Sequence, residues 1–106
     1  MIAVTEDNFD ALLASKLPVL LDVYADWCPP CRRIAPLIEQ LAVELEGRAL
    51  VAKLDSEAYP NLIARLGIDS LPTFIVFNEG AEVHRMVGLQ ARETLLDRLG
   101  LTNLGG

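Results

Sequence analysis

Two near-continuous apolar runs, separated by a segment with helical spacing, constrain the fold of this chain more than any other feature. The runs cover residues 19–25 and 49–54. Runs of this length are typical of strands buried on both faces, as in a parallel sheet with helices on each side. Between them, over residues 30–45, apolar residues recur at intervals of three and four, which is the spacing of one helix face. The sequence therefore predicts a strand-helix-strand unit with a right-handed crossover.

Weaker patterns on either side of this unit predict the remaining elements. Residues 73–77 and 82–87 flank a turn sequence, which favours a β-hairpin whose second strand lies near a sheet edge. The other elements that we expect are one short strand and three helices, over residues 2–4, 7–15, 57–66 and 91–101. Together these elements predict an α/β fold in which a central mixed five-stranded sheet is flanked by four helices on both faces.

Glycine and proline residues mark the expected ends and irregularities of the helices. Gly47 is expected to end the helix between the two apolar runs, and Gly67 is expected to end the next one in a left-handed cap. Pro36 lies inside the first of these helices, where its missing amide and its bulky ring predict a kink. Residues 102–106 are expected to fray.

Length and composition favour one soluble domain. The chain has 106 residues, of which 52% are apolar and 23% are charged, so a single packed core is expected rather than disorder. The net charge of −6, with only Arg32 and Arg33 clustered, argues against a nucleic-acid surface. No apolar run approaches the roughly 18 to 20 residues that span a bilayer, and the N-terminus lacks a secretory signal pattern. We therefore expect a cytoplasmic protein with no nucleic-acid or membrane partner.

Both cysteines of the chain lie in the stretch Trp27-Cys28-Pro29-Pro30-Cys31, where the first apolar run gives way to a helix. Two thiols at this spacing on the first turn of a helix can close a reversible disulfide. Beside a strand-helix-strand pattern the motif is typical of redox sites. A disulfide that closes so short a loop restricts the unfolded chain very little, so a purely structural role is the weaker interpretation.

Beyond this motif, the chain resembles the thioredoxin family along nearly its whole length. The matching segments occur in the family's order and are Asp22 to Arg32, Ile34-Ala35-Pro36, Lys53-Leu54-Asp55, Leu66-Gly67-Ile68, Leu71-Pro72-Thr73 and Val87-Gly88. The resemblance implies a single thioredoxin domain over residues 1–106, with the thioredoxin fold and no bound cofactor. The chain departs from the family's pattern at Pro29, where glycine is usual.

Cys28 is the expected nucleophile of the pair. Thiol-disulfide exchange needs a thiolate, which the free amides and the positive dipole end of a helix N-terminus stabilise. Pro30 suits the first helical position, and the amide of Cys31 remains available to Cys28. Pro29 has no N–H and should avoid helical dihedrals because it precedes another proline, so we expect it to tune the redox equilibrium. The alternative is that both cysteines are merely small buried apolar residues.

Cys31 is the expected resolving thiol, which attacks Cys28 in the mixed disulfide and releases the reduced product. Asp22 is the candidate base, because a carboxyl group inside the first apolar run would be desolvated and its pKa raised. By resemblance, Asp22 is the family's buried aspartate below the disulfide, and Lys53 is the lysine near it. The alternatives are an outward-pointing acid and an ordinary surface lysine.

Two further positions are expected to contact substrate. Trp27 precedes the nucleophile and should lie partly exposed beside it, as its family counterpart does; a core tryptophan is the alternative. Pro72 matches the family's cis-proline opposite the cysteines. A cis peptide bond there would expose the backbone of Leu71 for strand-like pairing with an extended substrate.

The resemblance also implies an apolar docking rim around the cysteines. Its expected members are Pro30, Leu71, Val87, Gly88 and Leu89. The alternative for the last three residues is plain packing along an edge strand.

Two other functions compete with disulfide exchange. A structural metal site needs about four ligands, and Cys28, Cys31 and the distant His84 supply too few without a bridging dimer. A thioredoxin-fold binding or chaperone subunit is the second alternative. We expect instead a monomeric protein-disulfide reductase of cell redox homeostasis and electron transport, without a metal. Its partners would be disulfide-containing target proteins and, by resemblance, an NADPH-dependent thioredoxin reductase.

Overall fold

The computed structural model describes residues 1–102. Its elements, in chain order, are β1 (Ile2–Ala3), α1 (Phe9–Leu13), β2 (Val19–Tyr24), α2 (Pro29–Glu44), β3 (Leu50–Asp55), α3 (Pro60–Leu66), β4 (Thr73–Asn78), β5 (Ala81–Val87) and α4 (Arg92–Arg98). The fraying expected for residues 102–106 lies, from residue 103 onward, outside the described residues.

The five strands form one mixed sheet in the order β1-β3-β2-β4-β5. β1 and β2 pair in parallel with β3, whereas β4 pairs antiparallel with both β2 and β5. The predicted strand-helix-strand unit is thus β2-α2-β3, and the hairpin strand β5 lies at a sheet edge. The expected mixed five-stranded sheet is confirmed.

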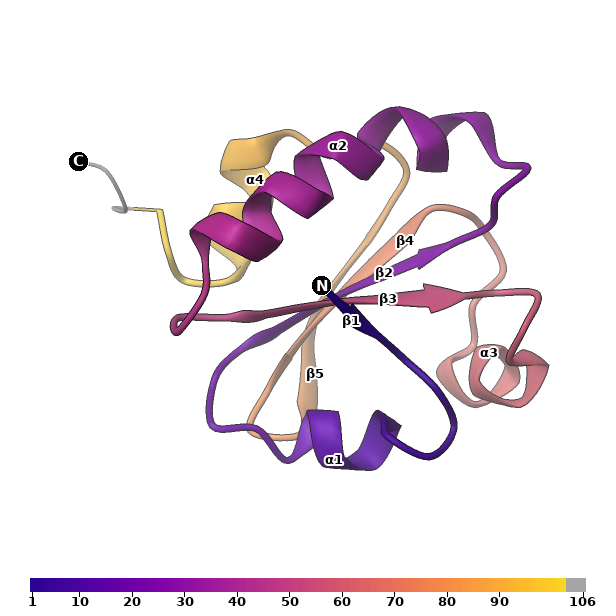
Figure 1. The fold of residues 1–106 in the computed structure, drawn as a ribbon, viewed down its shortest axis with the longest axis horizontal. Helices are drawn as coiled ribbons and strands as arrows, with labels where there is room; N and C mark the ends of the chain where they lie inside the picture. The colour runs from indigo at the N-terminus through magenta and orange to yellow at the C-terminus, as the bar shows by residue number, and fades with distance from the viewer. Residues whose placement is uncertain (103–106) are drawn as a thin grey trace.

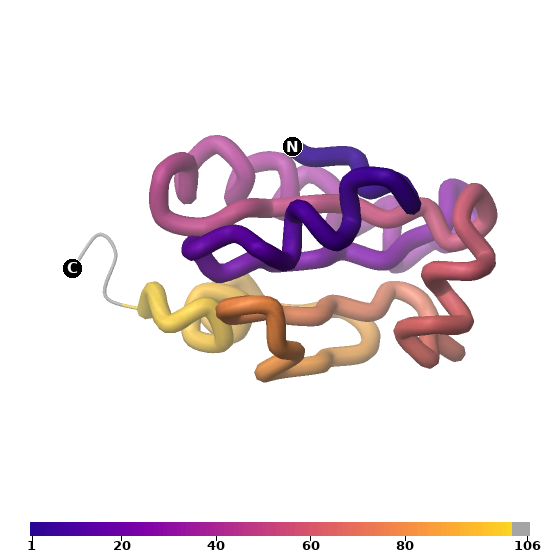
Figure 2. Tube along the Cα trace, turned by 90° about the horizontal axis from the view of Figure 1, so that it is seen from below, coloured from indigo at the N-terminus to yellow at the C-terminus, as the bar shows by residue number. Residues whose placement is uncertain are grey.

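Two helices cover each face of the sheet. α2 and α4 lie on one face, and α1 and α3 lie on the other (Figure 1). Seen from below, β4, β5 and α4 gather on one side of the molecule, while β1, β2 and β3 lie on the other (Figure 2). The helices therefore cover both faces of β2, whose first five residues are buried, and most of β3, as the continuous apolar runs predict.

Alternate residues of β2 enter different cores. Leu20 belongs to a cluster with α2 and α4 side chains, whereas Leu21 belongs to a cluster with side chains of α1 and α3. Because successive side chains of a strand point to opposite faces, Asp22 lies on the α2 side of the sheet, as Leu20 does. Asp22 is in register with Lys53 of β3. The strand pattern thus brings the carboxyl group of Asp22 and the amino group of Lys53 together beneath α2.

Several helices begin later or end earlier than predicted. The helix expected over residues 7–15 starts only at Phe9, because Thr5 and Asn8 hold the preceding turn. The backbone N–H of Thr5 donates to Asn8 Oδ1 at 2.8 Å, and the backbone N–H of Asn8 donates to Thr5 Oγ1 at 3.1 Å. The helix expected over residues 57–66 starts at Pro60, since the residue before a proline is disfavoured in the helical region.

Of the two helix ends predicted from glycine positions, the one at Gly67 is correct and the one at Gly47 is displaced. α2 ends at Glu44 rather than at Gly47, which lies in the turn that follows with a φ of 81°. Gly67 caps α3 in the left-handed conformation, with a φ of 65° and a ψ of 38°, as expected. α2 continues through Pro36, so the kink there stays a prediction. Among residues 1–102, no helix has both the length and the apolar composition needed to cross a membrane.

Candidate functional site

Cys28 and Cys31 are joined by a disulfide at the start of α2, with their Cα atoms 5.3 Å apart. Cys28 is the N-cap residue of the helix, and its Sγ accepts a hydrogen bond from the backbone N–H of Cys31 at 3.4 Å. The expectation that the Cys31 amide is available to Cys28 is therefore confirmed. The backbone N–H of Arg32 donates to the carbonyl oxygen of Cys28 at 3.1 Å, so the first turn of α2 is built around Cys28.

The two prolines between the cysteines correct the sequence prediction. α2 begins at Pro29, so Pro30 is the second helical residue rather than the first, and Pro29 does not avoid the helix. The fixed φ of proline suits this turn, and the amides that the prolines lack would have had no partner within the helix. Cys31 is consequently the first residue of α2 that has a backbone N–H to offer.

The disulfide separates two hollows of the surface. Both cysteines are buried, with exposed fractions of 3% and 4%, and they pack against Ala25 and Leu71. Cys31 lines a cavity of about 180 Å³ that also contains Asp22, whereas Cys28 lines a groove of about 370 Å³ that Trp27 flanks. The two cysteines therefore line hollows with different chemical surroundings.

Asp22 lies in the cavity on the Cys31 side. Its exposed fraction is 5%, and its Oδ1 has no hydrogen-bond partner among the described residues. Burial raises the pKa of its carboxyl group to about 7, and the positive charge of Lys53 opposes this shift only partly. The expected burial and raised pKa are confirmed, and the alternative of an outward-pointing acid is wrong. A carboxyl group with this pKa can take up or release a proton near neutral pH.

Lys53 stands beside Asp22 in the sheet. The two residues are partners in the β2–β3 register, and both line the cavity. The Nζ atom of Lys53 lies 5.9 Å from the centroid of the Tyr24 ring, within the range of a cation–π contact. Its half-buried position places one positive charge where it favours the ionised form of Asp22.

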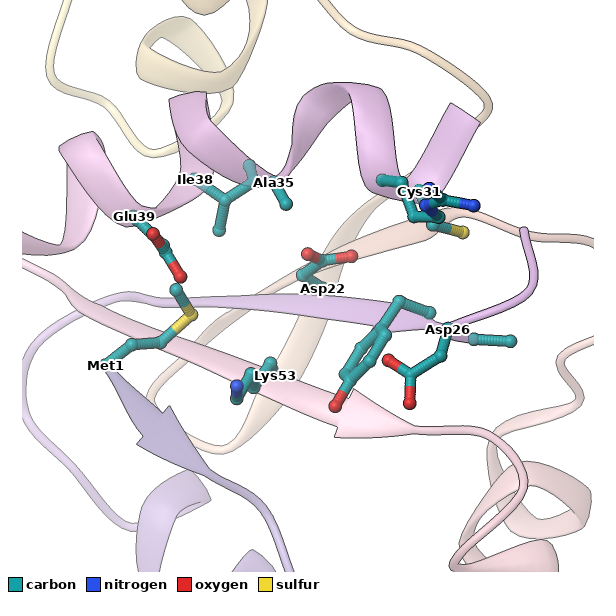
Figure 3. Close-up of a pocket in the computed structure, with 11 residues that line it drawn as sticks. Met1, Asp22, Asp26, Cys31, Ala35, Ile38, Glu39 and Lys53 are labelled. Atoms are coloured by element: carbon teal, nitrogen blue, oxygen red, sulfur yellow. The ribbon is translucent and has the colours of Figure 1, made fainter. Parts of the chain in front are cut away.

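The cavity contains residues that the sequence analysis missed. Asp22 points from β2 into the space beneath α2, with Cys31 toward one end and Met1 and Glu39 toward the other (Figure 3). Glu39 shares a helix face with Ala35, four residues earlier, which is the spacing that could have identified it. The position of Met1 carried no comparable signal, since it depends on the pairing of β1 with β3.

The groove on the Cys28 side combines an aromatic wall with the loop before β4. Trp27 is 64% exposed, as expected, and its indole N–H donates a hydrogen bond to the carboxylate of Glu57. The peptide bond between Leu71 and Pro72 is cis, as the resemblance implies. The residues that line the groove are Trp27, Cys28, Ser56, Ile63, Ile68, Asp69, Ser70 and Leu71. Of these, only Trp27, Cys28 and Leu71 are site residues predicted from the sequence.

The residues of the expected docking rim lie partly in this groove and partly beyond it. Leu71 is among the lining residues, but Pro30, Val87, Gly88 and Leu89 are not. The backbone N–H of Gly88 donates to the carbonyl oxygen of Pro72 at 2.8 Å, and Val87 pairs with Thr73. Exposed Val87 and Leu89 therefore lie at the end of β5 that adjoins the cis-proline.

The candidate metal ligand His84 lies in a different part of the structure from Cys28 and Cys31. Within residues 1–102, no three histidine, cysteine or acidic side chains are grouped so that they could hold a metal ion. His84 is exposed on β5 and lines a different cavity, together with Pro18 and Asp97.

The thioredoxin family model matches residues 1–100 of the chain. The chain belongs to the thioredoxin family. A thioredoxin-like protein from Synechocystis sp. is 43% identical over 93 residues, which are 87% of this chain and 89% of the relative. A thioredoxin from Staphylococcus aureus is 40% identical over 99 residues (93% and 94%), and one from Rickettsia felis is 39% identical over 95 residues (89% and 90%).

Thioredoxin-family membership and the paired cysteines together define the activity. The protein is a thiol-disulfide oxidoreductase, and its substrates are proteins that contain disulfides. The thioredoxin fold expected from the sequence is confirmed. A binding subunit without redox turnover and a metal-bridged dimer are not favoured.

Proposed function

We propose that this oxidoreductase works as a reductant and that its two cysteines have separate tasks. The Cys28 thiolate attacks one sulfur of a target disulfide, so that a mixed disulfide forms and the other target sulfur leaves as a thiolate. The Cys31 thiolate then attacks Cys28 Sγ and closes the Cys28–Cys31 disulfide, while the second target sulfur leaves. Two electrons pass to the target. The observation that carries this proposal is the position of the disulfide between a groove that Cys28 lines and a cavity that Cys31 shares with Asp22.

Asp22 is the proposed proton acceptor for Cys31. A thiol attacks only after it has lost its proton, and a carboxylate with a pKa of about 7 can accept that proton at neutral pH. Lys53 would keep part of the Asp22 population ionised through its charge. Both residues line the same cavity as Cys31, which gives the proton a polar route from the thiol.

Trp27, Leu71 and Pro72 are the proposed substrate-binding residues beside Cys28. Leu71 lines the groove, where its backbone would pair with an extended target segment. Trp27 would cover one side of that segment. Pro30, Val87, Gly88 and Leu89 would contact larger targets beyond the groove.

The remaining biological context is also proposed. An NADPH-dependent thioredoxin reductase would return the disulfide to the dithiol, so that the protein carries electrons from NADPH to its targets. We propose that residues 1–106 form one thioredoxin domain and that the protein acts as a cytoplasmic monomer without a cofactor. The family match over residues 1–100 supports the single domain.

A coupled assay tests the proposed direction of electron flow. The protein would be mixed with insulin, NADPH and a bacterial thioredoxin reductase, and the oxidation of NADPH would be followed. We expect oxidation in proportion to the amount of protein added. Absence of insulin reduction, both in this assay and with dithiothreitol as the reductant, would overturn the proposal.

Replacing Pro29 with glycine should move the redox equilibrium toward the dithiol. Glycine adds a backbone N–H beside Cys28, whose Sγ already accepts a hydrogen bond from the Cys31 amide, and it loosens the loop that the disulfide closes. We expect the equilibrium constant with glutathione to change about two- to ten-fold. The measurement is the fraction of dithiol across a series of glutathione buffers, and an unchanged equilibrium would show that Pro29 does not tune the pair.

A further inference from the structure

The groove beside Cys28 contains a negative charge that disulfide exchange itself does not need. Asp69 lines the groove and is exposed, and its Oδ1 accepts a hydrogen bond from the Ser70 hydroxyl at 3.3 Å. Glu57 adds a second carboxylate beside the groove, where it accepts the hydrogen bond from the Trp27 indole. Asp69 thus lines the same groove as Cys28, and Glu57 contacts the residue that precedes Cys28.

Nearby cations do not cancel this negative charge. Arg85 is near enough for the charge of Asp69 to contribute to the raised pKa of its guanidinium, after the larger effect of Glu82. That guanidinium donates two hydrogen bonds to the Glu82 carboxylate, at 2.8 and 2.7 Å, and one to the carbonyl oxygen of Gly67 at 3.4 Å. Asp69 and Glu82 together carry two negative charges against the single positive charge of Arg85. Arg32 lines the cavity on the opposite side of the disulfide. Within the described residues, the lining of the groove contains no lysine or arginine.

We infer that this groove prefers target disulfides whose cysteine is followed or preceded, within about two residues, by lysine or arginine, and that Asp69 determines the preference. The inference rests on the proposed function, in which the backbone of Leu71 pairs with an extended target segment. Asp69 stands two residues before Leu71, and two residues of an extended chain span about 7 Å. A long cationic side chain next to the target cysteine reaches across that distance.

The chemistry of the groove favours a cation over other substrates. Its apolar residues Ile63, Ile68 and Leu71 accommodate the aliphatic stem of lysine or arginine, while the charged end meets Asp69. An anionic side chain in the same place would face the Asp69 carboxylate. Exposed ion pairs are weak, so the expected preference for lysine over glutamine is about two- to five-fold in kcat/KM, and it should fall at high salt.

Three peptides that share one disulfide and differ at a single residue test this inference. The residue two positions from the reactive cysteine is lysine, glutamine or glutamate, and kcat/KM is measured for the wild type, Asp69→Asn and Asp97→Asn. Asp97→Asn is the matched control, because it changes the net charge equally at an exposed aspartate that lines another cavity. A second control, Glu57→Gln, removes the carboxylate beside the groove and retains an oxygen for the Trp27 indole.

We expect the wild type and Asp97→Asn to reduce the lysine peptide faster than the glutamate peptide. This preference should be smaller in Glu57→Gln and mostly lost in Asp69→Asn. Equal reduction of the three peptides by the wild type, or an unchanged preference in Asp69→Asn, overturns the inference and leaves the proposed function intact. Failure of the wild type to reduce any of the peptides overturns both.

Discussion

Replacement of Cys31 by serine is expected to stop turnover and to leave Cys28 bonded to the target. The first exchange needs only Cys28, which lines the substrate groove, whereas release of the target needs a second thiol. We expect insulin reduction to fall at least about a thousand-fold, since the two thiols act as one unit. Mass spectrometry of the variant after exposure to a peptide disulfide should show one peptide attached at Cys28.

The reciprocal variant, Cys28→Ser, is the control for this experiment. It should lose turnover to the same extent, but it should not accumulate the peptide adduct, because Cys31 faces the cavity with Asp22 rather than the groove. Equal rates of adduct formation in the two variants would contradict the proposed division of tasks. Retention of turnover in either variant would contradict a dithiol mechanism altogether.

Replacement of Asp22 by asparagine is expected to stabilise the oxidised protein at pH 8. Burial raises the pKa of this carboxyl group from 3.8 to about 7. Between about pH 4 and pH 7 the folded protein therefore keeps a proton that the unfolded chain releases, so stability falls as the pH rises through this window. Above pH 7 the buried, ionised carboxylate exerts its full destabilising effect.

The size of this effect follows from the same two pKa values. The difference between 3.8 and about 7 corresponds to about 4 kcal/mol, and because a buried amide also lacks partners we expect a gain of about 2 to 4 kcal/mol. Urea unfolding at pH 8 and at pH 4 measures it, and the gain should be much smaller at pH 4. Asp26→Asn, at an exposed aspartate that lines the same cavity, should change stability by less than about 0.5 kcal/mol. Equal stability of the wild type and Asp22→Asn at pH 8 would contradict the conclusion that a buried, ionised Asp22 destabilises the protein.

Most of the fold could be predicted from local patterns. The apolar runs that became β2 and β3 are continuous because helices cover both faces of these strands, and the helix between them repeats its apolar face every three to four residues. The errors lie at element ends. Thr5 with Asn8, and Tyr59 before Pro60, hold turns that helical periodicity cannot reveal, because the turn depends on side-chain bonds and on the proline ring.

The site residues that could be predicted are those that stand out within a single segment of the sequence. Cys28 and Cys31 are three residues apart, and Asp22 is an acid inside an apolar strand. Ile63, Ile68 and Asp69 were not predicted as site residues, because the groove forms where α3 and the loop before β4 meet Trp27. Such a meeting of distant segments leaves no periodic trace in the sequence.

Alkylation of the reduced wild-type protein tests most directly the central claim that Cys28 faces the substrate and Cys31 faces Asp22. The reduced protein would be treated at pH 7 with less than one equivalent of iodoacetamide, quenched with acid and mapped by peptide mass spectrometry. The structure predicts that the label lies almost entirely on Cys28, which lines the groove and occupies the N-cap of α2. A label mainly on Cys31, or divided equally between the two thiols, would contradict the claim.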